Sequence, residues 1–177
     1  MLLSVISLDE NKNPFCLLEA FKILYQRNFK VKLNIIGDGE LSEQINQLIN
    51  KEGFSESIKL LGWQPRHEVA RLMRDACDIF VLSSRSETFG VVIIEAMASG
   101  KPVVSTRCGG PESIMTKPYL GELCENNNPV SLADMIQKVA NNLKEYDQMM
   151  IRDFALQNYS FSVIAQKINH VYQNIET

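Results

Sequence analysis

The residues of this chain best suited to chemistry gather in one polar loop, residues 83–90. The loop contains three serines, Glu87 and Thr88, and ends in Phe89 and Gly90 before an apolar segment that favours a helix. Unpaired backbone N–H groups and about half a positive charge at a helix N-terminus suit a phosphate group. Gly90 has no side chain, so a phosphate can approach the backbone there. The alternative is that the serines only cap the helix and Gly90 only permits tight packing.

Glu87 and Glu95, eight residues apart, supply two carboxylates to this segment. The spacing alone is uninformative. Glu87 lies in the loop, however, and Glu95 lies within the following helix, roughly 9 Å along its axis at 1.5 Å per residue. A carboxylate accepts two hydrogen bonds from a vicinal diol. The pair is therefore suited to bracket an extended ligand whose diphosphate lies at the helix end. The alternative for Glu95 is an exposed helix face.

Other loops offer weaker signals. Lys12 lies beside a second helix start, where a cation can neutralise a diphosphate without a metal; alone, it would be interpreted as a solvated lysine. The turn at residues 37–39 lacks the G-x-G-x-x-G pattern, so a dinucleotide site is disfavoured and a strand-to-helix turn with positive φ is expected. Residues 109–112 place a carboxylate at another helix start. Trp63 lies near a nucleobase or, more simply, packs in the core or at a rim.

The elements that must position these loops alternate between strands and helices. This alternation predicts an α/β fold with a doubly wound parallel sheet of about six strands, helices on both faces and extra C-terminal helices, in one domain over residues 1–177. In such sheets, ligands bind beyond the carboxyl ends of the strands. Strands are expected at residues 2–8, 31–36, 58–61, 78–82, 102–105 and 120–123. Helices are expected at residues 13–28, with Asn13 as N-cap, and at 41–52, 66–76, 89–99, 131–142, 144–158 and 161–174, with a short turn from residue 111.

The composition excludes several classes of protein. A net charge of -3 argues against nucleic acid or an anionic membrane as the main partner. The apolar runs are too short to span a bilayer, and the N-terminus does not resemble a signal peptide. Four scattered cysteines without a C-x-x-C pair indicate reduced thiols in a cytoplasmic protein. Two distant histidines and the absence of a D-x-D run argue against a dedicated metal site.

Four segments, in this order, resemble the donor-binding domain of family 4 glycosyltransferases, which are retaining enzymes with two Rossmann-like domains facing a cleft. The resemblance covers nearly the whole chain. The most specific segment is residues 87–104, ETFGVVIIEAMASGKPVV, which is similar to the family's Glu-x7-Glu signature. The other three are LNIIGDGE at residues 33–40, IKLLG at residues 58–62 and CGGPESI at residues 108–114, the last resembling the Gly-Gly-x-Glu loop.

The resemblance implies roles for these residues. Glu87 would contact hydroxyls of the transferred sugar, and Glu95 would contact the ribose diol. Backbone N–H groups around Gly90 would hold the distal phosphate, with Lys12 beside it and no metal ion or other cofactor. The expected catalytic residues are Glu87 and Lys12, and the expected donor-binding residues are Ser7, Gly37, Thr88, Phe89, Gly90, Val91 and Glu95.

The chain departs from the family pattern at the end of its first strand. The family has Gly-Arg-Leu there, and the arginine helps to bind the diphosphate, whereas this chain has Ile6-Ser7-Leu8. Ser7 cannot supply that charge. We therefore expect that Lys12 acts alone, or that Arg85 or Arg107 substitutes.

The second departure is that an N-terminal acceptor domain does not precede these segments. The expectation is a part of a longer enzyme, or a stand-alone binding subunit. Residues 161–174 resemble the family's closing helix, which returns toward the missing domain; ordinary packing on the sheet is the alternative.

The expected activity is transfer of a hexose from a UDP- or GDP-type sugar to a glycan or lipid-linked acceptor bound by the missing domain. Polysaccharide biosynthesis in the cytoplasm is the implied setting, with any association with the inner face of the membrane made through the missing half. The competing hypothesis is a non-catalytic nucleotide-sugar-binding subunit or inactive paralogue. A nicotinamide or flavin enzyme is disfavoured by the absent fingerprint, and an epimerase of similar architecture is conceivable only on fold grounds.

Overall fold

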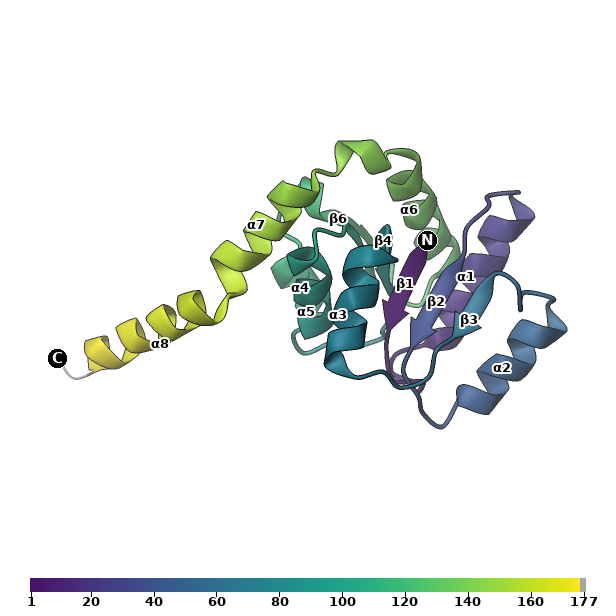
Figure 1. Ribbon diagram of the computed structural model, residues 1–177, viewed down its shortest axis with the longest axis horizontal. Coiled ribbons are helices and arrows are strands. Elements are labelled where there is room, and N and C mark those ends of the chain that lie inside the picture. The colour runs from purple at the N-terminus through teal and green to yellow at the C-terminus, as the bar shows by residue number, and fades with distance from the viewer. Residues whose placement is uncertain (176–177) are drawn as a thin grey trace.

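The computed structural model describes residues 1–175 and contains one six-stranded, all-parallel sheet (Figure 1). The strand order is β3-β2-β1-β4-β5-β6, so the chain builds outward from β1 in one direction and then from β4 in the other. This is the doubly wound, Rossmann-like order, and the predicted fold class is confirmed. The strands are β1 Leu2–Val5, β2 Leu33–Ile36, β3 Ile58–Leu60, β4 Ile79–Leu82, β5 Val103–Thr106 and β6 Gly121–Cys124.

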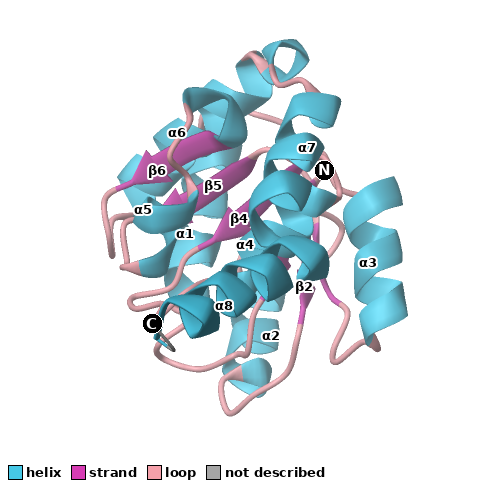
Figure 2. Ribbon diagram, turned by 90° about the vertical axis from the view of Figure 1, so that its left-hand side faces the viewer, coloured by secondary structure: helices cyan, strands magenta, loops and turns pink. Residues whose placement is uncertain are grey.

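Helices cover both faces of the sheet (Figure 2). Helices α1, α2 and α6 pack together in one layer, and α3, α4 and α7 pack together in the other. The α-helices are α1 Pro14–Gln26, α2 Ser42–Lys51, α3 Arg66–Asp75, α4 Val91–Ala98, α5 Gly110–Ile114, α6 Pro129–Asn141, α7 Gln148–Tyr159 and α8 Phe161–Ile175. Two short 3-10 helices, η1 Pro118–Leu120 and η2 Leu143–Glu145, complete the chain's described elements.

The core explains why the central strands are uniformly apolar. Phe80, Val81 and Leu82 of β4 are fully buried because helices cover both faces of the sheet there. The four cysteines, Cys16, Cys77, Cys108 and Cys124, are buried free thiols. Within residues 1–175, no helix combines the length and the apolar character needed to cross a bilayer.

Several details at the helix starts differ from the sequence prediction. Helix α4 begins at Val91 rather than residue 89, because Gly90 takes a left-handed conformation with φ 93° and ends the preceding loop. Helix α7 begins at Gln148 rather than residue 144, because the Asp147 carboxylate accepts hydrogen bonds from the first N–H groups of the helix. The Asn13 side chain does not cap α1; its amide donates instead to the Asn127 side chain.

The last helix, α8, extends away from the sheet domain (Figure 1). Helix α7 packs against α4, and Ile151 and Ala155 are buried there. Helix α8 packs mainly on α7, and its apolar side chains remain in solvent, with Phe161 98% exposed and Tyr172 65% exposed. The predicted C-terminal helices are confirmed, and α8 does not pack on the sheet.

Candidate functional site

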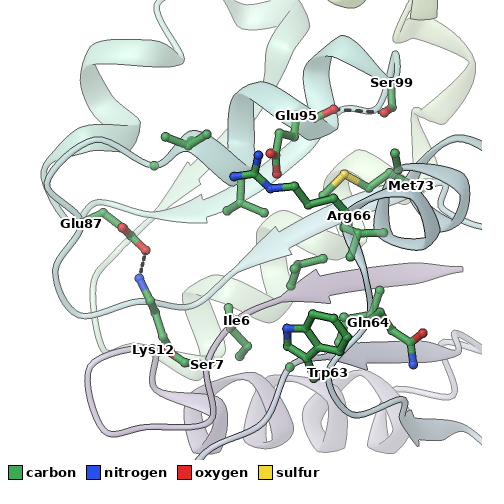
Figure 3. A pocket seen from close by; sticks show the side chains of 18 of the residues that line it. Ile6, Ser7, Lys12, Trp63, Gln64, Arg66, Met73, Glu87, Glu95 and Ser99 are labelled. Carbon is green, nitrogen blue, oxygen red and sulfur yellow. Dashed lines mark hydrogen bonds and ion pairs between the residues drawn. The ribbon is translucent and has the colours of Figure 1, made fainter.

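A cleft of about 1000 Å³ opens at the carboxyl ends of the strands, between α3 and α4 (Figure 3). The loops after β1 and β4 form one part of it, and the end of β2 and the turn after β3 form another. Strands β1 and β4 are the neighbours from which the sheet builds in opposite directions. The cleft therefore lies at the topological switch point, where doubly wound sheets bind ligands.

The cleft brings together eight of the nine residues singled out from the sequence. The exception is Thr88, which is exposed beside the cleft but does not line it. Glu95 is also exposed, and it lines the cleft from α4. Its exposure on the helix face is therefore compatible with a place in the cleft. The members of this set that line the cleft are Ser7, Lys12, Gly37, Glu87, Phe89, Gly90, Val91 and Glu95.

The N-terminus of α4 opens into this cleft. Its N-cap residue, Gly90, lines the cleft. Because glycine has no side chain, it cannot accept a hydrogen bond from the first N–H groups of the helix. The first N–H groups of an α-helix have no partner within the helix. The lining residues Gly90, Val91 and Val92 thus bring the positive end of a helix dipole to the cleft wall.

The loops after β1 and β4 bring Lys12 and Glu87 together in the cleft. The Lys12 ammonium forms an ion pair with the Glu87 carboxylate, which also accepts a hydrogen bond of 3.0 Å from the Ser84 hydroxyl. The Glu87 side chain is only 13% exposed and that of Lys12 24%. The two predicted catalytic residues therefore neutralise each other in this structure.

Further hydrogen bonds hold the two loops of this pair together. The Ser83 hydroxyl donates to the Lys12 carbonyl over 2.9 Å, the Asn11 amide donates to the Ser86 carbonyl over 3.0 Å, and the Arg85 N–H donates to the Asn11 carbonyl over 2.7 Å. The serines predicted to bind phosphate or cap the helix thus include one that fastens the loops to each other.

The Gly109–Gly110 pair supports the Glu87 loop. The Glu87 N–H donates to the Cys108 carbonyl, and the Gly110 N–H donates to the Glu87 carbonyl over 2.7 Å. A Cβ on Gly110 would lie 2.1 Å from the Phe89 carbonyl oxygen, so only glycine permits this approach. The Glu112 carboxylate accepts hydrogen bonds from the N–H groups of Cys108 and Gly109. Residues 109–112 therefore shape the loop that carries Glu87.

The β1–α1 loop is organised around Asp9. The Ser7 hydroxyl donates to the Asp9 carboxylate over 2.5 Å, and the Lys12 N–H donates to it over 2.9 Å. Burial raises the pKa of Asp9, but these hydrogen bonds outweigh that effect and hold the pKa below its ordinary value. Ser7 thus positions the loop through an ionised Asp9 and adds no positive charge to the cleft.

The two arginines considered as substitutes for the family's arginine are not in the cleft. Arg85 forms an ion pair of 3.2 Å with Glu10, and neither Arg85 nor Arg107 lines the cleft. Neither arginine is therefore positioned in the cleft to take the place of the family's arginine.

Gly37 is required by the close approach of two strand ends. Its φ is +133°, and a Cβ there would lie 1.7 Å from the Ile6 carbonyl oxygen. The predicted turn with positive φ is therefore confirmed at Gly37. The following Asp38 carboxylate accepts hydrogen bonds from the Ser42 hydroxyl and the Gly39 N–H at the start of α2.

Sequence reasoning missed the wall formed by α3. Arg66 and Met73 of α3 line the cleft together with Gln64, and Arg66 extends toward α4 in Figure 3. Trp63, which the sequence places either near a nucleobase or in core or rim packing, lines the cleft with 74% of its surface exposed. For Trp63, Gln64 and Arg66, the sequence signal that could have placed them in the site is their position between strand β3 and the start of helix α3. Among residues 1–175, no group of three or more His, Cys, Asp or Glu side chains is placed to hold a metal ion.

Comparison with known proteins identifies the family. Residues 1–153 match the family described as glycosyl transferases group 1. The chain belongs to this family. The family 4 resemblance predicted from residues 87–104 and the three other segments is confirmed.

Relatives and solved structures agree with this assignment. An uncharacterized glycosyltransferase of Methanocaldococcus jannaschii is 31% identical over 98% of this chain and 44% of its own length. A D-inositol 3-phosphate glycosyltransferase of Corynebacterium urealyticum is 28% identical over 96% of this chain and 42% of its own length. The crystal structure of Anabaena HepE in complex with UDP-glucose superposes with a TM-score of 0.82 and 26% identity, over 98% of this chain and 48% of that one. The chain thus spans less than half the length of each of these proteins.

Proposed function

We propose that this chain is the donor-binding half of a retaining, metal-independent glycosyltransferase, with a donor-binding domain that spans residues 1–177. The enzyme would move a hexose from a UDP- or GDP-type sugar to a glycan or lipid-linked acceptor, in polysaccharide biosynthesis. The observation that carries the proposal is the convergence of the α4 N-terminus, the Lys12–Glu87 pair and Glu95 in one cleft at the switch point. The UDP-glucose bound to HepE, a structure of the same fold, supports a UDP-type donor.

The roles follow from the positions along the cleft wall. Glu95, within α4, would accept hydrogen bonds from the ribose diol, and the N–H groups near Gly90 would hold the distal phosphate at the helix mouth. Glu87, beyond the mouth, would accept hydrogen bonds from the hydroxyls of the sugar. The apolar walls, which include Val92 and Met73, would exclude water around the nucleoside.

Catalysis would consist of stabilising the leaving group. When the bond between the anomeric carbon and the diphosphate oxygen breaks, negative charge develops on the departing oxygen. The α4 dipole and the Lys12 ammonium would stabilise that charge without a metal ion. Because Glu87 pairs with Lys12, donor binding would redistribute the Lys12 ammonium between the carboxylate and the phosphate. The acceptor hydroxyl would enter from the part of the enzyme outside this chain.

A thermal-shift panel of UDP, GDP, ADP and their glucose derivatives tests the proposal. A ligand at 100 times its dissociation constant stabilises a protein by about 2.7 kcal/mol. For a domain of this size that corresponds to a rise in Tm of roughly 5–10 °C. We expect UDP or GDP compounds to raise the Tm and the isolated chain to transfer no sugar. If no nucleoside diphosphate raises the Tm at millimolar concentration, the donor-binding role is wrong.

The second candidate is a non-catalytic nucleotide-sugar-binding module, which Ser7 in place of the family's arginine favours. Both candidates predict donor binding. They differ when the chain is joined to the acceptor-binding half of a relative, because only the first predicts that the hybrid releases UDP or GDP from its sugar donor.

A further inference from the structure

The cleft contains few cations for a ligand that carries a diphosphate. Among the described residues that line it, Lys12 and Arg66 are cationic, whereas Asp38, Glu87 and Glu95 are anionic. The side chains of the lining thus carry a formal charge of 2 − 3 = −1. A diphosphate adds at least two further negative charges, so its binding depends strongly on each available cation.

Lys12 is already engaged by a carboxylate. Its ammonium pairs with Glu87, which the Ser84 hydroxyl and the Cys108 carbonyl hold in place. Any phosphate that approaches Lys12 shares it with this carboxylate. Ser7, which follows β1, donates its hydroxyl hydrogen bond to Asp9 and carries no charge.

Arg66 is the lining cation without a partner in the described part of the chain. It is the first residue of α3, is exposed, and forms no ion pair or hydrogen bond through its guanidinium with residues 1–175. Figure 3 shows its side chain extending from α3 across the cleft toward α4, where Glu95 lies. The other arginines of α3 differ, because Arg71 pairs with Glu68 and Arg74 pairs with Asp75.

We infer that Arg66 is the second cation of the donor site and binds the diphosphate from the wall opposite the α4 N-terminus. This inference rests on the proposed function. A ribose held by Glu95 is joined through its 5′ carbon to the α-phosphate, so a guanidinium that extends from α3 toward α4 would lie within reach of that group. Arginine suits the task because its planar fork donates two parallel N–H bonds to phosphate oxygens. The charge absent at Ser7 is thus supplied from a different element.

The test compares UDP and uridine as probes, titrated by NMR into the 177-residue chain and its variants. Arg66→Ala is expected to weaken UDP binding by about tenfold or more and to change uridine binding less than twofold. Arg66→Lys should recover part of the loss, since it restores the charge but not the fork. Arg74→Ala is the matched control, because it removes an equal charge from the same helix outside the cleft. The loss for Arg66→Ala should also shrink as salt rises from 50 to 500 mM.

Each outcome decides between distinct conclusions. Equal losses for UDP and uridine would mean that Arg66 contacts the nucleoside, and the inference would be wrong. Unchanged UDP binding in Arg66→Ala, or the same loss in Arg74→Ala, would mean that Arg66 is a solvent-exposed charge that does not bind the diphosphate, and the inference would be wrong. If the unmodified chain binds neither UDP nor GDP, it is the proposed function that fails.

Discussion

The ion pair between Lys12 and Glu87 joins residues 75 positions apart in the sequence. Each residue was identifiable separately, Glu87 from its loop and Lys12 from its helix start. Their mutual neutralisation was not, because periodicity and spacing report local structure only. A lone arginine such as Arg66 belongs to no spacing pattern, so the sequence does not predict its place in the site. That place follows only from the positions of α3 and α4 on the two sides of the cleft.

Glu95 provides the first prediction at the scale of single residues. Glu95→Gln keeps the shape of the side chain but removes the charge that strengthens hydrogen bonds from a diol. We expect UDP or GDP affinity to fall about tenfold, corresponding to about 1.4 kcal/mol, with unfolding in the absence of ligand nearly unchanged because Glu95 is exposed. The measurement is the nucleotide-induced rise in Tm.

Glu19→Gln, on the exposed face of α1, is the control for loss of one negative charge. An unchanged nucleotide response in Glu95→Gln would remove Glu95 from the site, whereas a loss shared by Glu19→Gln would indicate a general charge effect.

At the scale of elements, the sequence predicted all six strands and the seven longer helices, with errors confined to their ends. The strands were predictable because their burial on both faces demands continuous apolar runs, as in β4. The start of α4 was misplaced because Gly90 takes a left-handed φ of 93° and ends the preceding loop, which the spacing of apolar residues does not reveal. The location of the cleft followed from the predicted topology, but its α3 wall depended on helix packing.

Helices α7 and α8 differ in how they are held, which leads to the second prediction. Removing residues 161–177 should change the free energy of unfolding by less than about 1 kcal/mol, because Phe161, Val171 and Tyr172 of α8 are mostly exposed. Removing residues 147–177 should cost more than about 3 kcal/mol, because the buried Ile151 and Ala155 and their contacts with α4 are lost. Urea unfolding of the two truncated chains measures both.

The shorter truncation retains Tyr159, whose ring packs edge-to-face on Phe89 at 6.1 Å. Nucleotide binding should therefore survive it. If the two truncations destabilise equally, α8 contributes to the core of this domain, contrary to its exposure.

At the scale of the whole molecule, one hydrophobic core supports both halves of the sheet and buries the thiols. Burial raises the pKa of Cys16 to about 11, and those of Cys77 and Cys124 to about 12, from an ordinary value of 9.0. Cys16 lies in α1, Cys77 between α3 and β4, and Cys124 in β6, so each thiol reports on a different part of the core. Their titration therefore follows the integrity of the entire domain.

The third prediction follows from this difference between folded and unfolded chains. Because the folded pKa values are raised, the thiols stabilise the fold fully below pH 9, and this contribution is lost as pH rises from about 9 toward 11 or 12. Each thiol adds a slope of up to about 1.4 kcal/mol per pH unit in that window. The free energy of unfolding, measured with urea at pH 7.5, 9.0 and 10.5, should fall steeply above pH 9, and Cys77→Ala should make this fall shallower.

A free energy of unfolding that stays constant to pH 10.5 would show that the thiols have the same pKa in the folded and unfolded chain. Rapid labelling of the native thiols by a disulfide reagent at pH 8 would contradict their burial directly.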